Sequence, residues 1–170
     1  KGHEELIGPM WSWGVDTGTH AMRIIFGKVF DRYPKAKLLL GHMGEGLPYA
    51  LWRMDSRWAW HNHRGIELDL GNPSEYVRRN IYITTSGVDS APPLLCALLA
   101  VGAEHILFAT DYPFEEISLA TEFLRTAPIS EVDSVYSPST GGRYAAVVVR
   151  DQARPRAPTA SAPSCSARWT

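Results

Sequence analysis

Cysteine is scarce in this sequence, whose 170 residues include only Cys96 and Cys165. The two lie far apart in different surroundings, so neither a disulfide framework nor a cysteine-based zinc site is expected. Cys96 stands inside the apolar run LLCALLA, which predicts a buried thiol.

Long apolar stretches and an excess of charge are also missing. No segment approaches the roughly 18 uninterrupted apolar residues that predict a membrane-spanning helix. The formal net charge of -1 gives no general attraction to nucleic acid or to anionic membranes, and neither partner is expected. No signal peptide is evident, and we expect a cytoplasmic protein. The chain begins at Lys1 rather than at Met, as is typical of a sequence whose true N-terminus is missing.

The composition changes abruptly after Asp133. Residues 1–133 contain 12 Lys and Arg against 17 Asp and Glu, whereas residues 134–170 contain five Arg and a single Asp. The end of the chain is rich in Ala, Pro, Arg and Ser and has little to bury. We therefore expect one domain over 1–133 and an atypical, disordered tail over 134–170.

Segments typical of helices and of strands alternate within the first 133 residues. Apolar residues at helical spacing predict a helix over 17–33, which Pro34 ends. Short apolar or β-branched runs predict three strands, at 37–42, 81–87 and 105–113. Further helices are expected at 48–64, 74–79, 92–101 and 115–127. This alternation predicts an α/β fold with a parallel sheet, either open or forming the last three strands of an eight-stranded barrel.

Side chains able to do chemistry follow two of these strands. KLLLG is followed by His42, with Glu45 three residues later, and ILFAT is followed by Asp111. Such strand ends are where functional groups gather in parallel α/β folds. Asp111 could cap its loop, or act as a metal ligand or proton-transfer carboxylate. His42 could be a hydrogen-bonded strand-end residue, or a site residue oriented by Glu45. Their coincidence at matching strand ends favours an active site.

Three segments, in this order, carry a family resemblance: GHMGEGLPYALWRMD, NIYITTSG and ILFATDYPFE. They resemble the amidohydrolase-2 branch of the amidohydrolase superfamily, and within it the γ-resorcylate and dihydroxybenzoate decarboxylases. The resemblance runs from about Gly8 to Asp133. It implies the C-terminal portion of a metal-dependent (β/α)8 TIM barrel, namely the last three strands with their helices. It also implies one divalent metal, zinc or manganese.

The resemblance further implies residue roles. Asp111 matches the metal-associated aspartate at the end of the last barrel strand, His42 the catalytic histidine and Glu45 its acidic partner. Arg53 and Phe114 match positions that line or reach the substrate, and the resemblance to oligomeric enzymes places Arg53 across a subunit interface. The implied substrate is a small aromatic carboxylic acid. The implied reaction is non-oxidative decarboxylation, in which Asp111 protonates the ring carbon that bears the carboxylate.

The sequence departs from this family in two respects. The Glu/His-x-His metal motif of the first strand and the histidine of the fifth are absent. His20 and the His61–His63 pair fall on predicted helices, where a surface position is the expectation. After Asp133 the helix that closes the family's barrel is missing, and the sequence resembles a frameshift or a mispredicted splice.

Three functions therefore stay open. The first is a decarboxylase of this type, represented here by a fragment. The second is a hydrolase of the same superfamily, acting on a lactone or an amide with Asp111 as the base toward a metal-bound water. The third is a catalytically inactive fragment or a subunit that only binds.

Overall fold

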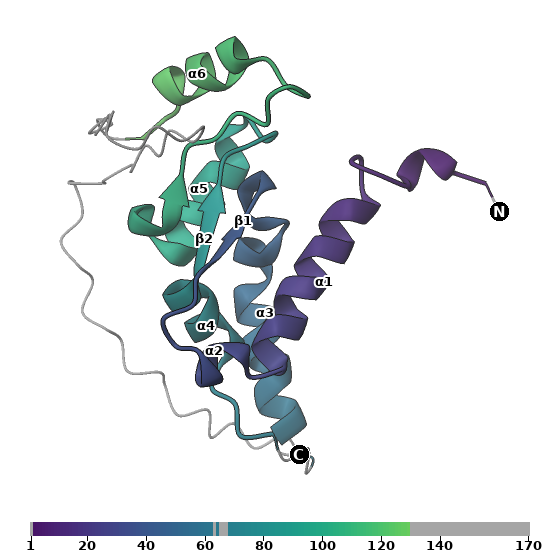
Figure 1. The fold of residues 1–170 in the computed structure, drawn as a ribbon, viewed down its shortest axis with the longest axis vertical. Helices are drawn as coiled ribbons and strands as arrows, with labels where there is room; N and C mark the ends of the chain where they lie inside the picture. Colours follow the sequence, from purple (N-terminus) through teal and green to yellow (C-terminus); the bar gives the residue numbers. More distant parts are fainter. Residues whose placement is uncertain (1, 63, 65–67, 130–170) are drawn as a thin grey trace, which may run out of the picture.

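A parallel three-stranded sheet with helices packed on it forms the centre of the molecule (Figure 1). The computed structural model describes residues 2–62, 64 and 68–129. The strands are β1 (Leu38–Leu40), β2 (Ile81–Thr84) and β3 (Ile106–Leu107), and they lie in that order in the sheet. Both neighbouring pairs are parallel. The predicted α/β fold with a parallel sheet is confirmed.

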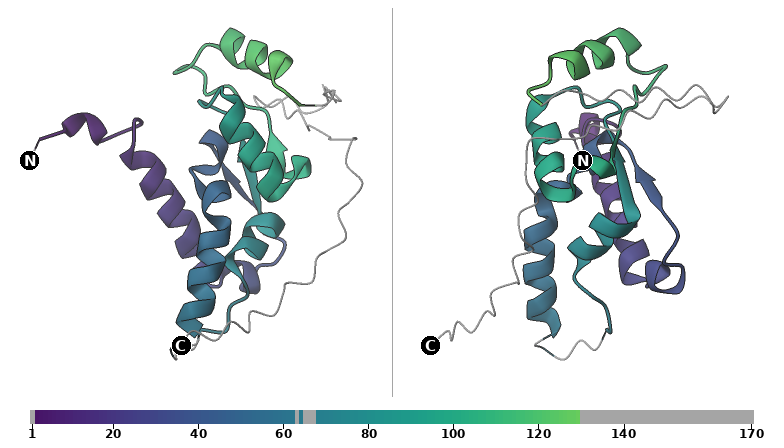
Figure 2. Two further views of the ribbon diagram at one scale, coloured as in Figure 1. Left: turned by 180° about the vertical axis from the view of Figure 1, so that it is seen from behind. Right: turned by 90° about the vertical axis from the view of Figure 1, so that its left-hand side faces the viewer.

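Helices precede and follow each strand, as the alternation predicts. In chain order they are α1 (Ser12–Phe26), α2 (Val29–Arg32), α3 (Leu47–Asn62), α4 (Pro73–Asn80), α5 (Ala91–Val101) and α6 (Ile117–Thr126). Short 3-10 turns are η1 (Glu4–Leu6), η2 (His42–Gly44) and η3 (Ala103–His105). Helices α3 and α5 contact each other and cover one side of the sheet, whereas the segment before α1 projects away from it (Figures 1 and 2).

The core lies between the sheet and its helices. Ile81, Ile83 and Ile106 are fully buried, and burying each such side chain contributes about 1.5–3 kcal/mol. The alternate strand positions are less covered, since Leu39 is 61% exposed and Tyr82 is only half-buried. A parallel sheet is ordinarily covered on both faces. The second face of this sheet is therefore only partly covered by the described residues.

The helix predicted over 17–33 is interrupted. It begins earlier, at Ser12, and ends at Phe26, because Gly27 and the left-handed Lys28 (φ 57°) break the chain direction before α2. The Arg32 guanidinium stabilises this break by donating to the Gly27 carbonyl at 2.7 Å. The prediction of one continuous helix was therefore wrong at Gly27, because glycine is unfavourable inside a helix.

The third strand is shorter than its apolar sequence predicts. Only Ile106 and Leu107 pair with β2. Beyond them the Thr85 hydroxyl replaces the strand partner, because it donates to the Ala109 carbonyl at 2.9 Å and accepts from the Ala109 N–H at 3.1 Å. A side chain thus holds the segment that leads to Asp111.

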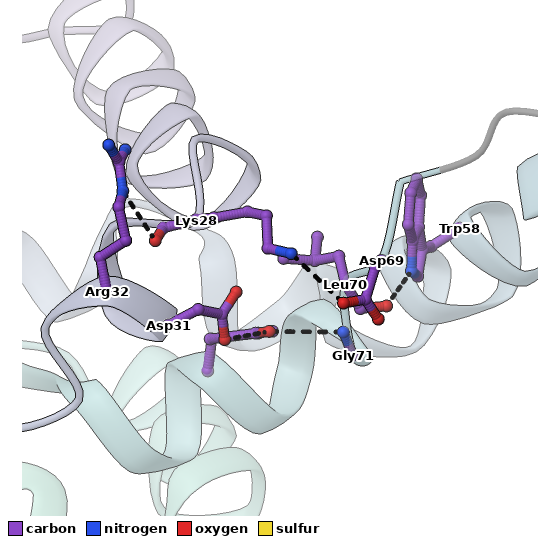
Figure 3. A network of polar contacts seen from close by, with 8 residues as sticks. Lys28, Asp31, Arg32, Trp58, Asp69, Leu70 and Gly71 are labelled. Atoms are coloured by element: carbon purple, nitrogen blue, oxygen red, sulfur yellow. Dashed lines mark hydrogen bonds and ion pairs between the residues drawn. The ribbon is translucent and has the colours of Figure 1, made fainter.

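Polar contacts join the helices at the amino end of the sheet (Figure 3). The Tyr76 hydroxyl donates to Asp31 at 2.8 Å and accepts from the Gly71 N–H at 3.3 Å. Burial raises the pKa of the Tyr76 hydroxyl, and its hydrogen bond to Asp31 raises it further. The Trp58 indole donates to the Leu70 carbonyl at 3.2 Å. These contacts fix α2, α3 and α4 relative to one another, far from the carboxyl ends of the strands.

Three other predictions concern single features. Cys96 is half-buried rather than fully buried, because it lines a surface cavity. Among the described residues, no helix is long and apolar enough to span a membrane. The tail predicted over 134–170 lies outside the described residues.

Asn80 provides a test of this fold. It is fully buried at the end of α4, just before β2, and its side-chain amide donates to the carbonyls of Pro34 and Ala36 at 3.1 and 2.9 Å. Replacing Asn80 with Ala should lower the free energy of unfolding by about 1–3 kcal/mol, because both bonds and close packing are lost. Urea denaturation measures this. Lys35→Ala, at an exposed side chain of the same loop, should leave the value unchanged.

Candidate functional site

The loop after β1 has an unusual backbone. All five residues of His42–Gly46 have positive φ, with 48° at His42 and 51° at Glu45. Asp111, after β3, has φ 57°. Left-handed backbone at residues other than glycine is uncommon and costs on the order of 1–3 kcal/mol each. All three predicted catalytic residues therefore have strained backbones, which is common in functional loops.

Gly87 lies where His42 and Asp111 meet. A methyl group built on Gly87 would lie 2.8 Å from Nδ1 of His42 and 3.1 Å from Oδ2 of Asp111. The residue also has φ 65°, so glycine suits it in both space and conformation. The imidazole and the carboxylate thus lie close to the same point, the position that a side chain on Gly87 would occupy, although they come from loops after different strands. The prediction that these strand ends form one site agrees with this geometry.

Two hydroxyl groups hold the backbone of His42. The His42 N–H donates to Oγ of the buried Ser86 at 3.3 Å, and Ser86 Oγ lies 2.8 Å from Oγ1 of Thr84. Sequence reasoning gave these residues no role. The signal was their spacing of two within the predicted strand 81–87, since residues two apart in a strand point to the same side.

Glu45 lies beside His42 and beneath α1. Its side chain is half-buried, and burial raises the pKa of its carboxyl group, while the His42 charge partly offsets that rise. The amino-terminal half of α1 approaches Glu45 closely, through Gly14 and Gly18. Glu45 is therefore screened from water on one side and lies within electrostatic reach of His42 on the other.

A cavity of about 310 Å³ opens between the first turns of α3 and α5. His42 lines it, so the imidazole is accessible from solvent. The remaining lining is mostly apolar and consists of Met43, Gly46, Pro48, Tyr49, Val88, Pro92, Pro93 and Cys96. Such a lining suits a flat hydrophobic group better than a highly charged one.

The two residues predicted to bind substrate, Phe114 and Arg53, differ in how near they lie to the candidate catalytic residues. Phe114 is 86% exposed, in the loop that Asp111 begins, and its N–H donates to the Asp111 carbonyl at 2.9 Å. The intervening Tyr112–Pro113 peptide bond is cis. Arg53 is exposed on α3 and is not among the residues lining the cavity. The structure thus places Phe114 near Asp111 but does not bring Arg53 to His42.

A complete metal site is not formed by the residues that the structure describes. They contain no group of three or more His, Cys, Asp and Glu side chains placed to hold a metal ion. Asp111 with His42 falls short of the three or four protein ligands typical of such sites. His20 and His61 are exposed on helices, as predicted, and His63 lies outside the described residues. Further ligands would have to come from elsewhere.

The sequence profile of the Amidohydrolase family matches residues 6–126. The chain belongs to this amidohydrolase family. Gamma-resorcylate decarboxylase from Polaromonas sp. is 44% identical to it over 132 residues, which are 78% of this chain and 40% of that protein.

Solved structures give the same family relationship. A 2,6-dihydroxybenzoate decarboxylase in complex with 2,6-dihydroxybenzoate has a TM-score of 0.70 at 39% identity, over 76% of this chain and 40% of that one. The dihydroxybenzoic acid decarboxylase of Polaromonas sp. JS666, with bound manganese and the inhibitor 2-nitroresorcinol, has a TM-score of 0.67 at 43% identity, over 76% and 39%. This amidohydrolase chain therefore spans about 40% of the length of these relatives. Its sheet is a portion of a TIM barrel, which confirms the predicted fold class.

Gly87 and Gly46 offer a matched pair of substitutions. Both have positive φ, at 65° and 78°, so alanine costs about 1–2 kcal/mol of backbone strain at either. Only at position 87 does the new methyl group meet other side chains, since nothing lies within 4 Å at Gly46. Gly87→Ala should therefore destabilise the chain more than Gly46→Ala in urea denaturation. It alone should shift the imidazole NMR signals of His42; equal effects of the two variants would contradict the geometry.

The raised pKa of Glu45 predicts that the free energy of unfolding depends on pH. Because its folded-state pKa is raised, folding favours the protonated carboxyl, and the ionised form loses stability as the pH rises through that pKa. Glu45→Gln should therefore raise the free energy of unfolding near neutral pH. The gain should shrink below about pH 4, beneath the ordinary pKa of a glutamate. Urea denaturation at both pH values measures this, with the exposed Glu4→Gln as control.

Proposed function

We propose that this chain belongs to a metal-dependent enzyme that removes the carboxylate of a hydroxylated aromatic acid without an oxidant. The observation that carries the proposal is the meeting of His42 and Asp111 at Gly87. The similarity to gamma-resorcylate and dihydroxybenzoate decarboxylases supports the choice of reaction. Because the chain spans about 40% of those proteins, the activity is proposed for the complete enzyme.

Asp111 is the acid in this proposal. Its protonated carboxyl group transfers a proton to the ring carbon that bears the carboxylate, so a C–H bond forms and the ring loses aromaticity. The C–C bond to the carboxylate then breaks, its electron pair restores the aromatic ring, and CO2 leaves. The substrate is neither oxidised nor reduced by an external reagent. Asp111 is left ionised and takes up a proton before the next cycle.

His42 and Glu45 steer the protonation of the substrate's hydroxyl or carboxylate in this scheme. An imidazole beside the reacting ring can exchange a proton with the hydroxyl or the carboxylate of the substrate. Glu45 supplies a negative charge near His42 when ionised, which favours the imidazolium form. The Ser86 hydroxyl, which accepts the His42 N–H, holds the left-handed backbone of His42 in place before the substrate arrives.

Arg53 and Phe114 complete the proposed substrate site. Phe114 is exposed next to Asp111, where its ring could cover one face of an aromatic substrate. Arg53 is exposed on α3, so its guanidinium is available to a carboxylate in another copy of the chain. We therefore propose that the complete enzyme is a homo-oligomer. A cytoplasmic location stays a prediction.

The proposed metal is one divalent ion, zinc or manganese, and Asp111 is the ligand that this chain supplies. A relative's structure contains manganese, which favours manganese over zinc. A divalent ion would hold negative oxygen atoms of the substrate and lower the pKa of nearby groups. Since the described residues do not complete a metal site, the remaining ligands are assigned to the part of the enzyme that the chain does not span.

One alternative has an observation in its favour. An inactive fragment or a binding subunit would lack a complete metal site, and the described residues contain none. Hydrolysis of a lactone or an amide by the same residues is the other outcome that the experiment must separate from decarboxylation.

A chimera tests the proposal. Residues 6–126 would replace the matching segment of the Polaromonas gamma-resorcylate decarboxylase, which is 44% identical and would supply the missing part of the barrel. We expect release of CO2 from 2,6-dihydroxybenzoate. Asp111→Asn and His42→Asn should each lower kcat by at least about 100-fold, because each removes a proton-transfer group.

The 170-residue chain purified alone should bind no stoichiometric zinc or manganese and release no CO2. A metal-loaded chimera that releases no CO2 would contradict the decarboxylase proposal. Hydrolysis of a lactone or an amide by that chimera would support the hydrolase instead.

A further inference from the structure

Glycine is concentrated where α1 passes over Glu45. Among the α-helices of the described residues, α1 alone contains glycine, at Gly14 and Gly18. Glycine is less favourable than alanine inside a helix because it loses more backbone entropy on folding. A helix that carries two glycines one turn apart therefore calls for a local reason.

The space at Gly14 is filled by the Glu45 carboxylate. A methyl group built on Gly14 would lie 2.8 Å from Oε2 and 3.8 Å from Cδ of Glu45. One turn further along, a methyl group on Gly18 would lie 3.3 Å from the Glu45 carbonyl oxygen. Residues four apart in a helix share a face. The same face of α1 thus contacts Glu45 twice, at its carboxylate and at its backbone.

We propose that Gly14 is a positioning residue for Glu45. The missing side chain at Gly14 leaves room for the carboxylate beneath α1, and this fixes the direction in which Glu45 approaches His42. The inference rests on the proposed function only in giving Glu45 a role in catalysis. The steric relation between Gly14 and Glu45 stands without it.

Gly14 and Gly18 differ in what an added methyl group would displace. At Gly14 it meets the tip of a flexible side chain, which can rotate away, so the chain should still fold. At Gly18 it meets backbone, in a loop with left-handed residues that cannot easily shift. Gly14→Ala should therefore move the carboxylate out into water and leave the fold intact.

Carbon-13 NMR of the glutamate carboxyl groups in the 170-residue chain tests this directly. In Gly14→Ala, the titration midpoint of Glu45 should fall toward that of an exposed glutamate, because the carboxylate regains water. The control is Thr19→Ala, on the exposed side of the same helix, which should leave the Glu45 midpoint unchanged. A folded Gly14→Ala chain with an unchanged Glu45 titration would overturn the proposal.

A second arm separates this inference from the proposed function. In the active chimera, Gly14→Ala should lower kcat by about 10- to 100-fold with little change in KM, because a displaced acidic partner misorients His42. In a Glu45→Asp background the side chain is one methylene shorter, and Gly14→Ala should then have little further effect. Additive losses of kcat would overturn the positioning role.

If the chimera is inactive, the proposed function fails and the NMR titration still decides the steric relation. If Gly14→Ala does not fold, the wild-type chain decides it through the nuclear Overhauser effect between the α-protons of Gly14 and the γ-protons of Glu45. Its presence supports the close approach, and its absence overturns it.

Discussion

The left-handed course of His42–Gly46 determines how the candidate site is built. An ordinary right-handed turn after β1 would send the imidazole and the Glu45 carboxylate in other directions. The neighbouring elements hold this costly backbone in place. Ser86 accepts the His42 N–H, and Gly44 lies so close to Ile83 that an added methyl group would be 2.9 Å from its side chain. The strained backbone is thus supported by β2, the central strand of the sheet, and by the turn that follows it.

The part of the site around Asp111 also depends on residues at the end of the central strand. The Thr85 hydroxyl holds the segment that follows β3 by bonding both the N–H and the carbonyl of Ala109. Two residues later the chain reaches Asp111, and Gly87 admits both its carboxylate and the His42 imidazole. Residues Thr84–Gly87 therefore connect the two loops that carry the candidate catalytic groups.

Strand ends and their chemistry could be predicted from sequence, because a polar residue after an apolar run is costly without a purpose. That reasoning found His42, Glu45 and Asp111. It missed Ser86 and Gly14, whose roles depend on contacts between elements distant in the chain. It also overextended the first helix through Gly27 and the third strand beyond Leu107, where a side chain outcompetes regular backbone pairing.

Family membership and site completeness are separate matters in this chain. The profile match and the 44% identical relative show the family, whereas the described residues offer too few ligands for a metal. The family match and the shortage of metal ligands are both consistent with a chain that spans about 40% of the length of its relatives and carries three barrel strands. The candidate catalytic residues lie in the loops that follow two of those strands.

The central claim is that the His42 imidazole approaches Gly87, the residue at which it meets Asp111, and one NMR measurement on the 170-residue chain tests that approach. The nuclear Overhauser effect between the Gly87 α-protons and the His42 imidazole Hε1 reports that approach, since a methyl group on Gly87 would lie 3.2 Å from Cε1. The account predicts a strong effect in the folded chain. Its absence from a folded chain with both signals assigned would contradict the account.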